Sequence, residues 1–168
     1  GSLLLLMSAG AVGAATLYVN CGGKSGLTSI GAALTVLQYS ESHGPSTINV
    51  SGTCNENVVI QGIDKLTLNA ARGASIKDPS SGNLSTLTID DSRDVTVNGF
   101  TINGGQDGID CQNGSLCRLT GNTVTNSPND GIGVWASSFA DVTGGTLTGN
   151  AYVGLQVANG ARGRASGV

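Results

Sequence analysis

The sequence predicts an all-β fold: a parallel β-solenoid, with one short helix covering its N-terminal end. Three observations point to it. A repeat of roughly 22 to 24 residues runs through the C-terminal half. Within each copy, short runs alternate apolar and polar residues, as half-buried strands do. The chain has 27 glycines in 168 residues and only 4% aromatics, a composition that favours strands and tight turns. One domain of this length buries a substantial core.

The N-terminal segment, residues 1–15, is typical of a signal peptide remnant. The apolar stretch from Leu3 to Ala15 is too short to span a bilayer, and it ends in small residues that suit signal peptidase. We expect cleavage after Ala14 or Ala15. The mature β-helix domain is then residues 16–168, secreted or periplasmic, with no membrane attachment. The alternative is a buried N-terminal strand.

The four cysteines are expected to form disulfides, because export places the chain in an oxidising compartment. Of the three pairings, we favour Cys21 with Cys54 and Cys111 with Cys117. The second pair closes a short loop around QNGSL. The alternative for each pair is two small buried thiols.

One helix is predicted over residues 27–38, LTSIGAALTVLQ, with Ser25 or Thr28 as the N-cap. The apolar residues at helical spacing are Leu27, Ile30, Leu34 and Leu37. A helix at this place covers the open end of a solenoid, where bare strand edges invite aggregation.

The repeat aligns three segments that begin at Val97, Leu119 and Val142. The aligned columns are Ile102, Val124 and Leu147; Ile109, Ile132 and Leu155; Cys111, Val134 and Val157; and Gly108, Gly131 and Gly154. A looser upstream copy consists of residues 66–78 and 86–90. Each copy holds three short strands, and it cannot bury its apolar face alone, so we expect the copies to stack as rungs about 4.8 Å apart.

The repeat continues to the last residues, ARGRASGV, and no capping segment follows it. We therefore expect the natural chain to continue beyond residue 168. Further rungs, or a second subunit in an oligomer, are expected to cover this open C-terminal end.

Three motifs carry a family resemblance: LYVNCGG, INVSGTCNENVVI and rungs ending in DGI-x-V. With them the chain resembles secreted bacterial proteins of the pectate-lyase-like superfamily from Leu17 to Val157. The resemblance implies a right-handed, single-stranded parallel β-helix. This superfamily includes pectate lyases, polygalacturonases, alginate epimerases and phage tailspikes, so the fold does not determine the reaction.

The segment QDGID resembles a rung of polygalacturonase-like glycoside hydrolases, and NDGIG resembles the rung that follows it. This resemblance implies that Asp107, Asp110 and Asp130 are candidate catalytic residues. The chain departs from the hydrolase pattern at two positions: Asn129 stands where a further aspartate is expected, and Val153 stands where a histidine is expected.

Asp107 and Asp130 are also candidate metal ligands. They occupy the same position in consecutive rungs, and two carboxylates at that separation either raise one pKa or bind a cation. Ca²⁺ is the ion considered, and no other cofactor is expected. The alternative is that both aspartates only form turns, because Asp hydrogen-bonds to its own backbone and the glycine that follows accepts a positive φ.

Trp135, Gln112 and Gln156 are candidate substrate-binding residues. Trp135 follows the inward-facing Val134 and should therefore face outward, where an indole can support a sugar ring. Gly133 and Gln156 share the outward column of Asp110, so we expect a groove to open there.

Three functions remain open for this sequence. The first is an extracellular module that binds carbohydrate. The second is a polysaccharide-active enzyme, a hydrolase or a lyase/epimerase of acidic glycans, and the third is a structural or adhesin spacer. A polysaccharide is the expected partner. The net charge of -3 and the pI near 4.8 argue against a nucleic-acid partner.

Overall fold

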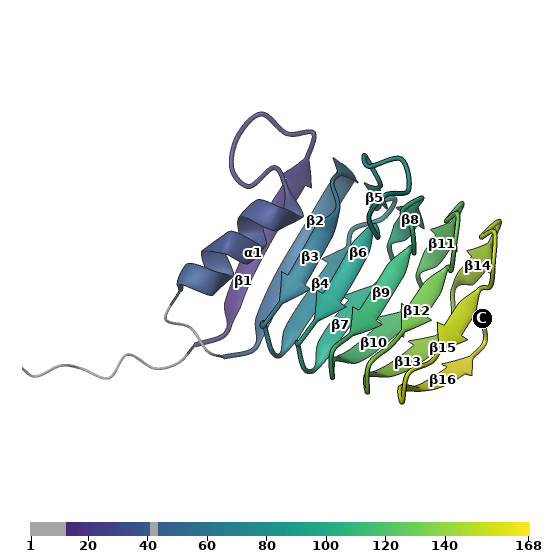
Figure 1. Cartoon of the computed structure of the whole chain (residues 1–168). Helices are drawn as coiled ribbons and strands as arrows, with labels where there is room; N and C mark the ends of the chain where they lie inside the picture. Colours follow the sequence, from purple (N-terminus) through teal and green to yellow (C-terminus); the bar gives the residue numbers. More distant parts are fainter. Residues whose placement is uncertain (1–12, 41–43) are drawn as a thin grey trace, which may run out of the picture.

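The computed structural model describes residues 13–40 and 44–168, which form a right-handed parallel β-helix with one helix at its N-terminal end (Figure 1). Three sheets, A, B and C, run along its length, and each rung of the repeat contributes one strand to each sheet. The expected fold class is confirmed. The signal-peptide prediction falls largely on residues 1–12, which lie outside the described residues.

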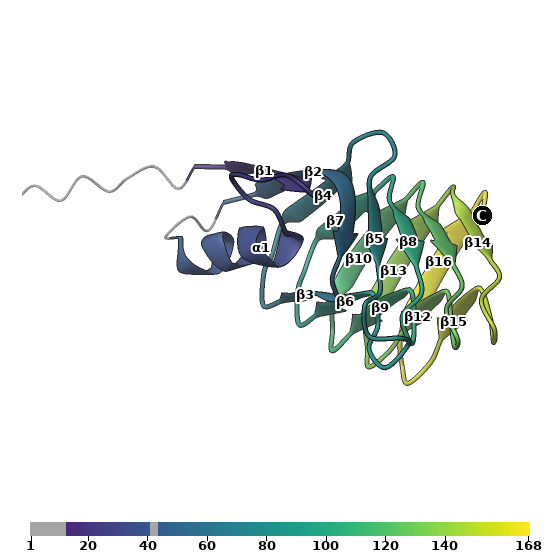
Figure 2. The same cartoon turned by 90° about the horizontal axis from the view of Figure 1, so that it is seen from above.

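Sheet A contains β1 (Ala15–Cys21), β2 (Ser46–Asn55), β4 (Leu66–Ala70), β7 (Val95–Asn98), β10 (Leu116–Thr120), β13 (Phe139–Thr143) and β16 (Arg162–Ser166). Sheet B contains the end of β2 with β5 (Ser75–Lys77), β8 (Thr101–Asn103), β11 (Thr123–Thr125) and β14 (Thr146–Thr148). Sheet C contains β3 (Val58–Gln61), β6 (Leu87–Asp90), β9 (Ile109–Gln112), β12 (Ile132–Val134) and β15 (Leu155–Val157). All strand pairs are parallel, and the strands of sheet C lie side by side in Figure 2.

The core consists of apolar columns that run through successive rungs. Ile102 pairs with Val124, and Val124 pairs with Leu147, as the aligned repeat predicts. The two predicted columns of sheet C are also confirmed by the strand register. Each rung buries its inward side chains only by stacking on its neighbours. Short strands in which apolar and polar residues alternate place all their apolar side chains on the inward face, and they therefore produce this fold.

The capping helix α1 (Ile30–Tyr39) lies over the first rung and contacts β1, β2 and β3. Its start differs from the prediction, because the N-cap is Ser29, whose hydroxyl accepts a hydrogen bond from the Ala32 amide at 3.1 Å. Leu27 belongs instead to an isolated bridge with Val19. The backbone amide of Asn20 donates a hydrogen bond to the carbonyl of Leu27. This bond holds Leu27 in an extended conformation, so the helix begins only after Leu27.

Glu56 forms a second cap, which sequence reasoning did not predict. Its carboxylate accepts hydrogen bonds from the backbone amides of Ile30 at 2.7 Å and Gly31 at 3.0 Å. These amides have no partner within the helix, and a carboxylate also interacts favourably with the positive end of the helix dipole. A residue of the first rung thus fixes the helix on the solenoid.

Both expected disulfides are present. Cys21 bonds to Cys54 and ties β1 to β2, while Cys111 bonds to Cys117 across the corner between sheets C and A. Both pairs are buried. The pairing therefore follows the prediction, and the alternative of free thiols is wrong in this structure.

Candidate functional site

The candidate site residues lie on the outer side of sheet C and at the turn that leads into it. One outward column of this sheet contains Val59, Thr88, Asp110, Gly133 and Gln156. Gln112 belongs to a neighbouring outward column, where it pairs with Asp90. The helical repeat therefore brings residues of several rungs onto one surface.

Asp107 occupies the turn before β9, and Asp130 occupies the same position one rung later. The amide of Gly108 donates to the carbonyl of Asp130 at 3.1 Å, which confirms that the two aspartates share a column. Oδ1 of Asp107 accepts hydrogen bonds from Nδ2 of Asn129 at 2.8 Å and from the amide of Asp130 at 3.0 Å. Asp107 thus links two rungs at a turn, and its catalytic or metal-binding role stays a prediction.

The buried carboxylate of Asp130 lies against the side chain of Gln156. With the Gln156 amide oriented so that its nitrogen faces the carboxylate, the nitrogen donates to Oδ2 at 2.6 Å and to Oδ1 at 3.2 Å. Burial raises the pKa of Asp130, and the negative charge of Asp107 raises it further. The predicted substrate-binding residue Gln156 is therefore held by a predicted catalytic residue.

Asp110 carries the largest pKa perturbation of this surface. Burial, followed by the negative charges of Asp107 and Asp90, raises the pKa of Asp110 to about 7, while a hydrogen bond from the indole of Trp135 opposes this effect. Among the described residues, no donor reaches Oδ1 of Asp110, although this atom is buried. A buried acceptor without a donor is costly, and the cost is greatest for the ionised carboxylate, which agrees with the raised pKa of Asp110.

The half-buried indole of Trp135 lies over Gly133. A Cβ atom added at Gly133 would lie 2.4 Å from Nε1 of Trp135, so the absence of a side chain there provides the space for the ring. Trp135 faces outward, as expected. The expected groove along this column is wrong at two points, because the indole fills the space above Gly133 and Gln156 turns towards Asp130.

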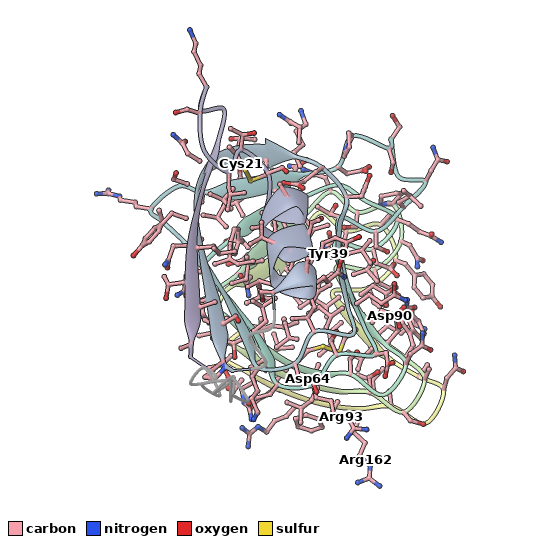
Figure 3. The ribbon with its side chains drawn as sticks, turned by 90° about the vertical axis from the view of Figure 1, so that its left-hand side faces the viewer. Cys21, Tyr39, Asp64, Asp90, Arg93 and Arg162 are labelled. Carbon is pink, nitrogen blue, oxygen red and sulfur yellow. A yellow bond between two sulfur atoms is a disulfide. The ribbon has the colours of Figure 1, made fainter. Side chains whose placement is uncertain are left out.

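Asp90 was not among the predicted site residues, although it belongs to this surface. Its carboxylate accepts hydrogen bonds from Asn113 at 2.6 Å and from Gln61 at 3.2 Å. Asp90 is labelled in Figure 3. The signal was available in the sequence, because the upstream copy at residues 86–90 places Asp90 in the column of Gln112.

The three predicted aspartates form a loose cluster. Within the parts of the chain that the structure describes, only one group of three metal-ligating side chains has all its ligand atoms within 4.8 Å of one another. That group is Cys21, Cys54 and Glu56, at the other end of the solenoid. The aspartate oxygens are therefore not gathered as a tight three-carboxylate cage.

A comparison with known protein families assigns this chain to one of them. The family model described as "Periplasmic copper-binding protein (NosD)" matches residues 25–167, most of the chain. The chain belongs to the NosD family. No curated protein and no solved structure matches it.

The NosD family is described as periplasmic, and this chain has two disulfides, which persist in oxidising compartments. The expected secreted or periplasmic location is thereby confirmed. Among residues 13–40 and 44–168, no helix has the length and apolar character to cross a membrane.

The donor atoms of this NosD-family chain are mostly oxygens. All four cysteines are in disulfides. The single histidine, His43, and the single methionine, Met7, lie outside the described residues. In the described part, the side chains that offer oxygen or nitrogen atoms to a ligand are therefore carboxylates, amides, hydroxyls, one indole, and the lysine and arginine side chains.

Proposed function

We propose that this chain is an extracellular glycan-binding module and that the outer face of sheet C is its binding surface. The observation that carries the proposal is the position of the indole of Trp135, seated over Gly133 between Asp110 and Gln156. A fixed aromatic ring supports the apolar face of a sugar, and neighbouring polar groups bind the hydroxyls.

The polar groups around the indole supply both donors and acceptors. Oδ1 of Asp110 is buried, so the polar side chains that a sugar can reach on this face are the half-buried ones of Gln112 and Asp90. Gln112 and Asp90 extend the polar surface on the next column. At pH values below about 7, the carboxyl group of Asp110 is mostly protonated, so it repels an acidic glycan less than an ionised carboxylate does.

A polysaccharide-active enzyme is the second candidate function, and the raised pKa of Asp110 favours it. A carboxyl group that stays protonated near neutral pH can donate a proton to a leaving glycosidic oxygen, while Asp107 or Asp130 serves as the second carboxylate. The departures at Asn129 and Val153 count against a complete hydrolase site, and we therefore place binding first.

Copper binding, which the family description names, does not fit the described residues in their disulfide form. Thiolate and thioether ligands select Cu⁺, and imidazole is a common nitrogen ligand of copper. The described residues include no free thiol, no methionine and no histidine. The glycan-binding proposal therefore involves no copper.

The test is a titration of the purified protein with acidic and neutral polysaccharides, each with Ca²⁺ and with a chelator. Binding and the release of reducing or unsaturated ends are followed together. Binding without cleavage supports the module, and cleavage that Asp110→Asn abolishes supports the enzyme. If no polysaccharide binds, both candidates are wrong and a structural spacer is left.

Trp135→Ala is expected to weaken glycan binding by about 5-fold to 150-fold, because stacking on a fixed aromatic ring contributes roughly 1–3 kcal/mol. Tyr18→Ala is the matched control. Tyr18 is an exposed aromatic residue on sheet A and should leave binding unchanged. Isothermal titration calorimetry with the best polysaccharide measures both variants. Loss of binding in Tyr18→Ala but not in Trp135→Ala would place the site on sheet A instead.

A further inference from the structure

We propose that the outer face of sheet B binds ice. Each rung presents two outward residues on this face, and the strand register aligns them in two columns. The first column contains Thr53, Ser75, Thr101, Thr123 and Thr146, and the second contains Asn55, Lys77, Asn103, Thr125 and Thr148. These two columns are the sheet B lattice. They lie on a different sheet from Asp110 and Gly133, so the inference is independent of the glycan-binding proposal.

The parallel register sets the spacing of the sheet B lattice. Because neighbouring strands lie about 4.8 Å apart, the side chains of one column repeat at that distance along the solenoid. The two columns are two residues apart on each strand, and a rise of about 3.3 Å per residue separates them by about 6.6 Å. Figure 1 shows β5, β8, β11 and β14 following one another in this order. The face therefore repeats in two directions.

Ice is an ordered solid whose oxygen atoms have spacings close to these. Its O–H···O hydrogen bonds are about 2.75 Å long, so tetrahedral geometry places second-neighbour oxygens about 4.5 Å apart. In the perpendicular direction, the same geometry repeats equivalent oxygens after about 7.3 Å. With the middle rung of three in register, the outer rungs are displaced by only about 0.3 Å along the solenoid, which hydrogen bonds of about 2.5–3.0 Å accommodate.

The side chains of the lattice are largely fixed before any ligand binds. Threonine occupies five of the six outward positions on β8, β11 and β14. A β-branched side chain has few χ1 rotamers, so its hydroxyl and methyl groups lose little conformational entropy on a solid surface. At the sixth position, Asn103 donates a hydrogen bond to Oγ1 of Thr125 at 3.2 Å. The hydroxyl of Ser75 donates to Thr53 at 2.9 Å and extends the first column.

The sheet B lattice faces solvent and carries little charge. Thr101, Thr146 and Thr148 are exposed. Among the ten residues of the two columns, only Lys77 is charged, and its strongly hydrated ammonium group disturbs ordered water. We therefore assign the ice contact to β8, β11 and β14. None of the ten residues is aromatic, so the lattice lacks the ring on which a sugar stacks.

Sheet A provides an internal comparison. One of its outward columns begins with three threonines and then becomes charged: Thr47, Thr67, Thr96, Arg118, Asp141 and Arg164. Arg164 forms an ion pair with Asp141, and Arg118 forms one with Asp94. Charged side chains of this kind hold their own hydration water. The comparison therefore favours sheet B as the ice-binding face, and it supplies a threonine for a control.

The experiment measures thermal hysteresis of the purified protein and its enrichment in slowly growing ice. We expect both for the wild type. Thr123→Tyr should lose most of each, because the larger ring in the middle of the lattice holds ice away from the neighbouring rungs. Thr67→Tyr is the matched control, since Thr67 is also a half-buried outward threonine with a threonine on each side, but on sheet A. It should leave both readouts unchanged.

Melting temperatures of all variants show whether each remains folded. Tyrosine is favoured in strands, and Thr101→Tyr, at an exposed position of the same column, repeats the test independently of Thr123. A wild type with neither hysteresis nor enrichment in ice would overturn the proposal. Equal losses in Thr123→Tyr and Thr67→Tyr would also overturn it. Binding to an insoluble polysaccharide that Thr123→Tyr weakens, without hysteresis in the wild type, would assign this face to a glycan instead. Trp135→Ala should leave the hysteresis unchanged, which separates this face from the glycan-binding surface.

Discussion

Ile109→Asp is expected to unfold the β-helix, with a loss of more than about 5 kcal/mol in the free energy of unfolding. Ile109 is fully buried in the middle rung of sheet C, where it pairs with Leu87 on one side and Ile132 on the other. A carboxylate at this position has no partner and no water. Because every rung is stabilised by its neighbours, the loss of one central rung separates the stack into two parts.

Far-UV circular dichroism and urea unfolding measure the effect of Ile109→Asp. Val59→Asp is the matched control. Val59 is a β-branched apolar residue in the same sheet, but its side chain is 52% exposed on the outer face. This substitution should change the unfolding free energy by only about 0.5 kcal/mol. A cooperative unfolding transition of Ile109→Asp close to that of the wild type would show that the inward assignment of this column is wrong.

Asp110→Asn is expected to stabilise the protein at pH 8 and to leave its stability unchanged near pH 4. The folded state raises the pKa of Asp110 to about 7 from its ordinary value of 3.8. Between these values, the folded state binds more protons than the unfolded state, so stability falls as the pH rises. Each pKa unit corresponds to about 1.4 kcal/mol, and partial exposure of the carboxyl group reduces the total, so we expect a gain of about 2 kcal/mol at pH 8.

Thermal unfolding from pH 4 to pH 8, in the presence of a chelator, measures this effect. The asparagine keeps an oxygen that can accept the hydrogen bond from Trp135, so the substitution mainly removes the charge. Asp141→Asn is the control, because a hydrogen bond from Arg164 lowers the pKa of Asp141 and this substitution should not stabilise the protein at pH 8. Parallel stability curves for wild type and Asp110→Asn would refute the buried-charge explanation.

The rungs could be predicted from the sequence because each inward position repeats in every copy. The columns of Ile102 and Ile109 were read correctly from a single alignment of the chain with itself, and the strand register follows them. The two disulfides were also predicted correctly. In a solenoid, residues that are one repeat apart in the sequence are neighbours in space. The period of the sequence therefore predicts which residues are in contact.

Contacts outside the repeat could not be predicted in the same way. The cap that Glu56 provides joins a rung to a helix more than one repeat away, and no periodicity links the two. The seat of Trp135 over Gly133 depends on how a side chain folds back on its own strand. For the same reason, the groove expected along the column of Asp110 was wrong. The strand register gives the position of each Cα atom, but it does not give the direction that a long outward side chain takes over its neighbours.

Glu56 and the Cys21–Cys54 disulfide hold the α1 end of the solenoid together. The disulfide joins β1 to β2, and two hydrogen bonds to Glu56 cap α1. Local opening of this end must break these contacts together, so the amides of β1 should exchange with solvent more slowly than those of the exposed loop between β1 and α1. The part of the solenoid next to α1 therefore resists local unfolding as one cooperative unit.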